Sequence, residues 1–199
     1  MNQSNNNALP WYHQLFSSRM LLCIYTGAVS GLPLYLLLQL LPAWLRTEGV
    51  SLADIGLFAL VGFPYNWKFL WAPLLDRYAL PWLGRRRGWM LLFQLLLVAA
   101  IASIGFIPVT STLSLVAVVA VIAALFSASL DVVVDAYRRE LLPDRELGLG
   151  NSVHIQAYRL SSLIPGSLGV ILGDFLPWHL VFLVMALFVA LGAALTFFI

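Results

Sequence analysis

A chain of 199 residues in which 61% are hydrophobic and only 10% are charged is too apolar for a water-soluble domain. The formal net charge of +2 is too small to indicate a nucleic-acid partner, and basic loops facing a lipid bilayer account for it. The composition therefore predicts an all-α integral membrane protein, because the alternating pattern of a membrane barrel is absent.

Six apolar stretches are each long enough to cross a bilayer as a helix. In chain order they lie near residues 19–45, 53–75, 89–108, 113–137, 148–173 and 177–199. Because they use almost all of residues 19–199, we expect one six-helix transmembrane domain preceded by a tail over residues 1–18. Aromatic residues of that tail, Trp11, Tyr12 and Phe16, suit the headgroup region.

Arginines are distributed unequally between the two sides of the predicted bundle. If the N-terminus is cytoplasmic, the opposite side carries only Arg46. The cytoplasmic side then carries eight: Arg19, Arg77, Arg85, Arg86, Arg87, Arg138, Arg139 and Arg145. Short loops rich in arginine stay in the cytoplasm. We therefore expect a multi-pass protein of a bacterial inner membrane with a cytoplasmic N-terminus.

Four charged residues lie inside predicted helices, namely Lys68, Asp131, Asp135 and Arg159. Each costs about 2.5–3.5 kcal/mol near the centre of a membrane helix. We therefore expect them to face the interior of the bundle, either paired or hydrated, and to mark a transport pathway with Asp131 as the proton carrier. Two structural alternatives stay open. Asp135 lies one turn from Arg138 and can form an ion pair with it, and Lys68 can reach toward the cytoplasmic surface.

The fifth predicted helix has one polar and small face, made of Ser152, Gln156, Arg159, Ser162, Gly166 and Gly173. Arg159 lies in the middle of this helix, and we expect it to bind either Asp131 or a substrate carboxylate. Gln39, Gln156, Tyr158 and Trp44 are candidates for contacts with a polar substrate. The two glutamines also suit hydrogen bonds between helices.

The loop after the second predicted helix reads "PLLDRYALPWLGRRRGW". Asp76 and Arg77 are followed by Gly84 and three arginines, Arg85, Arg86 and Arg87. This loop resembles the D-R-x-G-R-R loop of the major facilitator superfamily, with extra residues between Arg77 and Gly84. We expect its charges to form a network at the cytoplasmic ends of the helices, with Asp135 as a further candidate member.

Several motifs in register extend this resemblance. They are "SGLP" at 30–33, "KFLWAPLLDRY" at 68–78, "GRRRGW" at 84–89, "SASLDVVVDAYR" at 127–138 and "YRL" at 158–160. In that order they resemble the AmpG muropeptide permease family. The related acetyl-coenzyme A transporters share part of the pattern, so a transporter of another anionic solute is the alternative within the superfamily.

The resemblance implies a proton-coupled secondary transporter that imports anhydro-muropeptides for cell-wall recycling and, in some bacteria, for β-lactamase induction. It also implies that the chain is the N-terminal half of a transporter, so that a C-terminal six-helix half is a required partner. The charged loop would then stabilise the conformation that is closed on the cytoplasmic side.

A six-helix intramembrane enzyme is the alternative from a different class. The segment "GAVSG" at 27–31 has Ala28 in place of the first glycine of a G-x-S-G motif, and nothing brings Ser30 to a histidine. The histidines lack metal-ligand spacing, and no glycine-rich phosphate loop is present. We therefore expect no enzyme activity, metal, cofactor or ATP site. A simple scaffold would leave Asp131 and Arg159 unexplained.

Overall fold

The computed structural model describes residues 17–80 and 84–198. These residues are helical wherever they have regular structure, as the all-α prediction requires, and no strand occurs in either range. The predicted tail over residues 1–18, including Trp11, Tyr12 and Phe16, lies almost wholly outside the described residues.

Within the part of the chain that the structure describes, four helices are long and apolar enough to cross a membrane. They are the continuous segment Ser18–Thr47, α7 (Arg85–Ile104), α8 (Val109–Leu141) and α11 (Trp178–Phe198). The first of these joins α2 (Ser18–Tyr35), the π-helical turn η1 (Leu36–Leu40) and α3 (Leu41–Thr47). The chain is therefore a multi-pass membrane protein.

The second and fifth predicted membrane helices are interrupted. The second consists of α4 (Leu52–Leu57), η2 (Phe58–Gly62), α5 (Phe63–Trp67), η3 (Lys68–Leu70) and α6 (Ala72–Arg77). The fifth follows η4 (Asp144–Glu146) and consists of α9 (Leu147–Leu160), the π-helical turn η5 (Ile164–Gly169) and α10 (Val170–Phe175). Prolines stand at the start of α5, α6 and η5, where they remove a backbone donor. Such breaks are tolerated at membrane depth where protein buries them or water reaches them.

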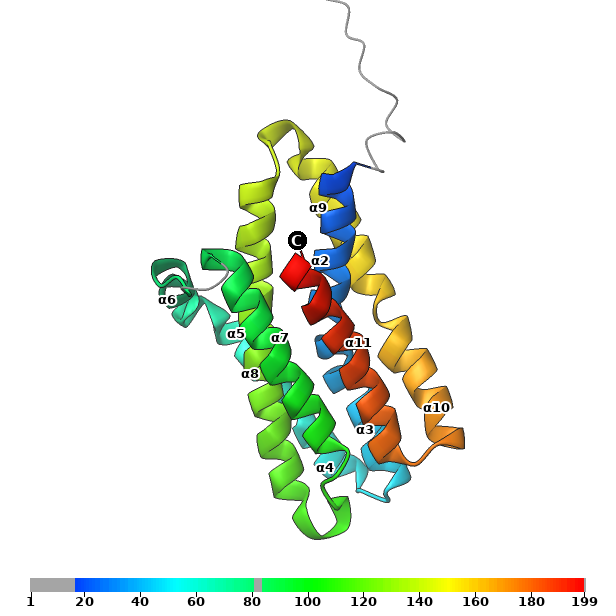
Figure 1. Ribbon diagram of the computed structural model, residues 1–199. Helices are drawn as coiled ribbons and strands as arrows, with labels where there is room; N and C mark the ends of the chain where they lie inside the picture. Colours follow the sequence, from blue (N-terminus) through cyan, green and yellow to red (C-terminus); the bar gives the residue numbers. More distant parts are fainter. Residues whose placement is uncertain (1–16, 81–83, 199) are drawn as a thin grey trace, which may run out of the picture.

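The bundle is built around α2 and α8, which contact each other (Figure 1). The helices α7 and α11 pack side by side, and α7 also packs on α8. The interrupted segments lie at the edges of the bundle, with α9 against α2 and with η2 and α5 against α8. The two interrupted segments thus occupy corresponding positions, each between two long helices, a pattern that the repeats of transporters share.

Two glycines of α2 bring its backbone close to α9. A Cβ at Gly27 would collide with the carbonyl oxygen of His154. A Cβ at Gly31 would collide with Oγ of Ser161 and would lie 2.5 Å from the carbonyl oxygen of Tyr158. This G-x-x-x-G spacing is typical of close helix crossings in membranes. The segment "GAVSG" is therefore a packing motif.

We expect Gly31→Ala to destabilise the fold, because the added methyl group forces α2 away from α9 and overpacking costs about 1–3 kcal/mol. The thermal unfolding midpoint of the purified protein in detergent should fall. Gly148→Ala on α9 is the matched control, since a Cβ there meets nothing within 4 Å. Equal unfolding midpoints for the two variants would show that the close crossing of α2 and α9 does not contribute to stability.

Candidate functional site

An ion pair inside the bundle joins the interrupted second segment to α8. Nζ of Lys68 lies 2.7 Å from Oδ2 of Asp131. The side chains are 31% and 15% exposed, respectively, so the pair is largely shielded. Ser30 of α2 donates a hydrogen bond to the other carboxylate oxygen of Asp131. A cation and a hydroxyl from two different segments therefore hold this carboxylate.

The interruption of the second segment positions the cation. Trp67 ends α5 with φ −105° and ψ 0°, and Lys68 begins the 3-10 turn η3 directly after it. Lys68 therefore lies where the helix changes direction. On either side of it, Tyr65 donates a hydrogen bond to Ser127, and Trp71 Nε1 donates to Ser129 Oγ at 2.9 Å. These bonds fix the break against the same stretch of α8 that carries Asp131.

The fourth wall of the site is α9. The backbone of Tyr158 packs against Gly31, the residue after Ser30. The side chain of Tyr158 is half-buried. The ring also makes an edge-to-face contact with Tyr35, with centroids 5.7 Å apart. The site is thus formed by α2, the second segment, α8 and α9.

Two other predicted charges lie apart from this pair. Asp135 accepts a hydrogen bond from Arg138 at 2.8 Å, which is the structural alternative expected for it. Arg138 also donates to Asn151 Oδ1 at 3.0 Å and so ties α8 to α9. Arg159 is exposed and takes part in none of the ion pairs found among residues 17–80 and 84–198. Asp131 is paired with Lys68 and not with Arg159.

The two predicted glutamines occupy different places. Gln39, in η1, is exposed and its amide oxygen lies against Gly166 of η5. Gln156 lines a groove between α2 and α9 together with Ile24 and Leu160. Trp44, in contrast, is 2% exposed and packs against Phe182.

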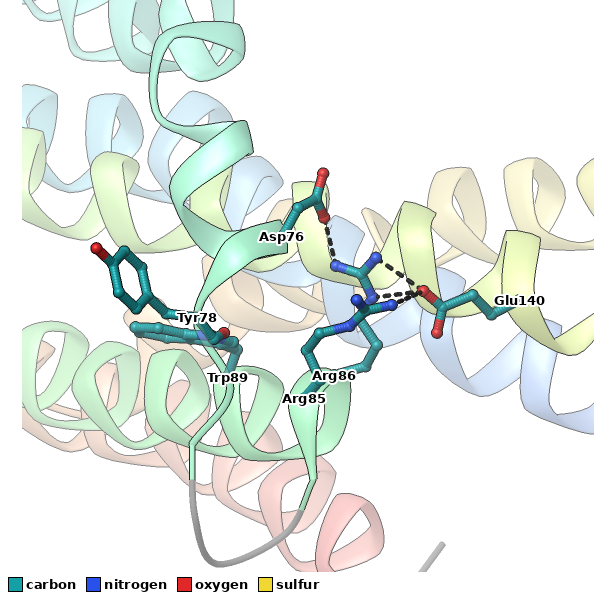
Figure 2. Close-up of polar contacts among 6 residues, drawn as sticks. All are labelled: Asp76, Tyr78, Arg85, Arg86, Trp89 and Glu140. Carbon is teal, nitrogen blue, oxygen red and sulfur yellow. Dashed lines mark hydrogen bonds and ion pairs between the residues drawn. The ribbon is translucent and has the colours of Figure 1, made fainter.

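A second cluster of charges lies at the end of the bundle that carries Arg19, Arg85–Arg87, Arg138 and Arg139, here called the arginine-rich end. Arg86 of α7 lies 2.5 Å from Asp76 and 2.8 Å from Glu140 of α8 (Figure 2). Arg85 lies 2.9 Å from the same glutamate. The predicted network is present in part: Asp76, Arg85 and Arg86 join it through Glu140, whereas Arg77, Arg87 and Asp135 lie outside it. The position of Glu140, directly after two arginines, was a signal that sequence reasoning missed.

The remaining loop residues have separate partners. Gly84 precedes α7 with φ +80°, a conformation that favours glycine. Arg77 lies over the ring of Tyr78, 6.0 Å from its centroid. Arg87 donates to the carbonyl oxygen of Phe197 at 3.0 Å, at the end of α11.

The serine that an intramembrane enzyme would need is engaged elsewhere. Ser30 donates to Asp131, while His154 is buried and lies 3.3 Å from the hydroxyl of Thr26. Among the described residues, therefore, Ser30 is not hydrogen-bonded to a histidine. Sequence reasoning considered Ser30 only within the "SGLP" and "GAVSG" segments and did not single out Tyr35 or Tyr65.

Comparison with known proteins identifies the family. A model of the Major Facilitator Superfamily matches residues 67–199. This chain belongs to the major facilitator superfamily.

Several curated relatives match most of the chain. It is 50% identical over 186 residues to an uncharacterized protein from Haemophilus influenzae, with 94% of this chain and 44% of that protein covered. It is 43% identical over 177 residues to the anhydromuropeptide permease of Escherichia coli K12, with 88% of this chain and 36% of that permease covered. It is 30% identical over 176 residues to the putative transporter AmpG 1 of Rickettsia conorii, with 86% of this chain and 42% of that protein covered. The chain thus spans less than half the length of these relatives, which include named permeases and transporters rather than enzymes.

We expect Lys68 and Asp131 to be energetically coupled, because removing one partner leaves the other charge shielded and uncompensated. In thermal unfolding, Lys68→Gln and Asp131→Asn should each destabilise the protein, and the double variant should lose much less than the sum. Arg139 and Asp144 form the matched control pair, with side chains 63% and 87% exposed. Exposed pairs contribute about 0–1 kcal/mol, so their cycle should be additive. Additivity at Lys68 and Asp131 as well would contradict the pairing.

Proposed function

We propose that this chain is the N-terminal half of a proton-coupled permease that imports anhydro-muropeptides across a bacterial inner membrane, with its N-terminus in the cytoplasm. The observation that carries the proposal is the Lys68–Asp131 pair, a shielded acid and base held between separate segments of a membrane bundle. The named permease relative at 43% identity supports the substrate class. The complete transporter requires a second six-helix half, and the substrate lies between the two halves.

Proton uptake and substrate binding are coupled through Asp131. While both groups are charged, Lys68 is engaged by the carboxylate at 2.7 Å. Protonation of Asp131 removes the charge that holds the ammonium group, and Ser30 keeps a hydrogen bond to the acid. The freed Lys68 then binds a carboxylate of the peptide part of the substrate. Deprotonation on the cytoplasmic side restores the pair and expels the substrate carboxylate.

Arg159 has a different role in this mechanism from Lys68. It makes no ion pair within the described residues and is exposed on α9, so it is available to an anion from outside this six-helix unit. A second carboxylate of the substrate, which carries several, is the anion that we assign to it. The planar guanidinium suits a carboxylate through two parallel hydrogen bonds.

The charge network at the arginine-rich end is the inner gate. Arg86 connects α6, α7 and α8 through Asp76 and Glu140, and its side chain is only 11% exposed. Because these bonds tie the ends of three segments together, they favour the conformation that is closed toward the cytoplasm.

Transport by the assembled permease tests the role of Asp131. The chain is co-expressed with the C-terminal part of the Escherichia coli permease, and uptake of a labelled disaccharide-tripeptide is measured in vesicles under a pH gradient. Asp131→Asn should abolish accumulation but keep exchange of substrate at equal pH, since the neutral side chain mimics the protonated state. Asp144→Asn, an exposed position, should accumulate normally. Normal accumulation by Asp131→Asn would make this aspartate structural, and no uptake by the wild type would overturn the proposed substrate.

The same vesicles test the gate. Arg86→Gln should slow uptake several-fold, because the closed state loses its contacts to both carboxylates, while the thermal midpoint changes little. Arg145→Gln is the control, since its side chain is 83% exposed and lies 3.7 Å from Glu146. If both variants transport at the wild-type rate, the network has no gating role.

A further inference from the structure

The π-helical turns of α2 and α9 meet at one edge of the site. η1 follows α2 directly, η5 follows the interruption after α9, and the two turns contact each other. Gln39 of η1 lies over Gly166 of η5, where a Cβ would collide with its amide oxygen. Gln39 is nevertheless exposed. π-helical turns are rare and frequent at functional sites, so two of them in contact beside an exposed amide indicate a binding surface.

A pair of tyrosines lies between this surface and the ion pair. The rings of Tyr35 and Tyr158 meet at an interplanar angle of 64°, and both residues are half-buried. Neither hydroxyl has a hydrogen-bond partner among the described residues. A partly exposed aromatic ring with a free hydroxyl offers an apolar face and a polar edge. A sugar ring, which has an apolar C–H face and a rim of hydroxyls, matches both.

The three features are ordered along α2. Ser30, which bonds to Asp131, is followed by Tyr35 and Gln39. At 1.5 Å per residue, Tyr35 lies about 7.5 Å from Ser30 along the axis of α2, and Gln39 follows within the π-helical turn, farther from the arginine-rich end. The site therefore presents a cation, then an aromatic pair, then an amide. Gln156 is not part of this order, because it lines the separate groove with Ile24.

We infer that a muropeptide binds with its sugars against Tyr35 and Tyr158, an acetamido group at Gln39, and its peptide carboxylates toward Lys68. This orientation rests on the proposed function. It makes the α2–α9 edge the sugar subsite, and it assigns to Tyr35 a role in substrate specificity.

Calorimetric binding to the co-expressed permease tests this orientation with three probes: the GlcNAc–anhydroMurNAc disaccharide, the disaccharide-tripeptide and the free tripeptide. Tyr35→Leu should weaken binding of both sugar-containing probes about tenfold, an effect of the size that one lost aromatic contact gives, and leave the free peptide unchanged. Lys68→Gln should weaken binding of the two peptide-containing probes and leave the affinity for the disaccharide unchanged. Tyr78→Leu is the matched control, since Tyr78 is an exposed tyrosine at the arginine-rich end. It should bind all three probes like the wild type.

The outcomes separate this inference from the proposed function. An unchanged disaccharide affinity in Tyr35→Leu, or an equal loss for the free peptide, overturns the orientation while muropeptide binding stands. Failure of the wild-type assembly to bind any probe overturns the proposed function and the orientation with it. Tyr158→Phe retains the ring pair and therefore the fold. It should lose part of the disaccharide affinity, and an unchanged affinity would count against a hydroxyl contact with the sugar.

Discussion

The charge cost of Lys68 and Asp131 at membrane depth is the constraint on which the arrangement of this bundle depends. Each charge alone would cost about 2.5–3.5 kcal/mol on insertion scales, so both must be compensated within the protein. The ammonium group of Lys68 and the carboxylate of Asp131 compensate each other at 2.7 Å. This distance requires the second segment to approach α8 closely at Lys68, and the interruption between α5 and η3 allows that approach. It also requires α2 to present Ser30 from the other side. The proline-associated break and the contacts of α2 and α8 in this region are thus consistent with the need to compensate one ion pair.

The two ends of the unit are held differently. At the arginine-rich end, Arg19 lies 3.3 Å from Glu146 and connects α2 to the start of α9. Arg86 connects α6, α7 and α8, and Arg87 holds the end of α11. Within residues 17–80 and 84–198, no ion pair joins segments at the opposite end, where apolar contacts such as Trp44 on Phe182 serve instead. Exposed pairs contribute little energy each, so they set the relative positions of segment ends, and the apolar core supplies the stability.

Composition predicted the membrane class, and the motifs predicted the superfamily. Of the four charges expected to face the interior, Lys68 and Asp131 form a shielded pair, whereas Asp135 and Arg159 are exposed; of the basic-loop network, Asp76, Arg85 and Arg86 take part. The partner of Asp131 could not be predicted: on straight helices Arg159 was a candidate for it, and Lys68 was free to reach toward the cytoplasmic surface. Two packing details decide between them. The proline-flanked break turns Lys68 toward α8, while Gly27 and Gly31 direct the face of α9 that contains Tyr158 toward α2. Both depend on contacts between distant segments, which helical periodicity does not encode.

The two interrupted segments occupy corresponding positions in the two three-helix runs, yet their cations are in different situations. Lys68 of the second segment is compensated by an aspartate inside the unit. Arg159 of the fifth segment is exposed, and no described residue forms an ion pair with it. A guanidinium at membrane depth is costly to leave without an anion, so the proposed permease would supply its counter-charge from beyond residues 17–80 and 84–198. In the proposed permease, this asymmetry makes the α9 side the part of the site that a substrate, or an acidic side chain of the second half, would complete.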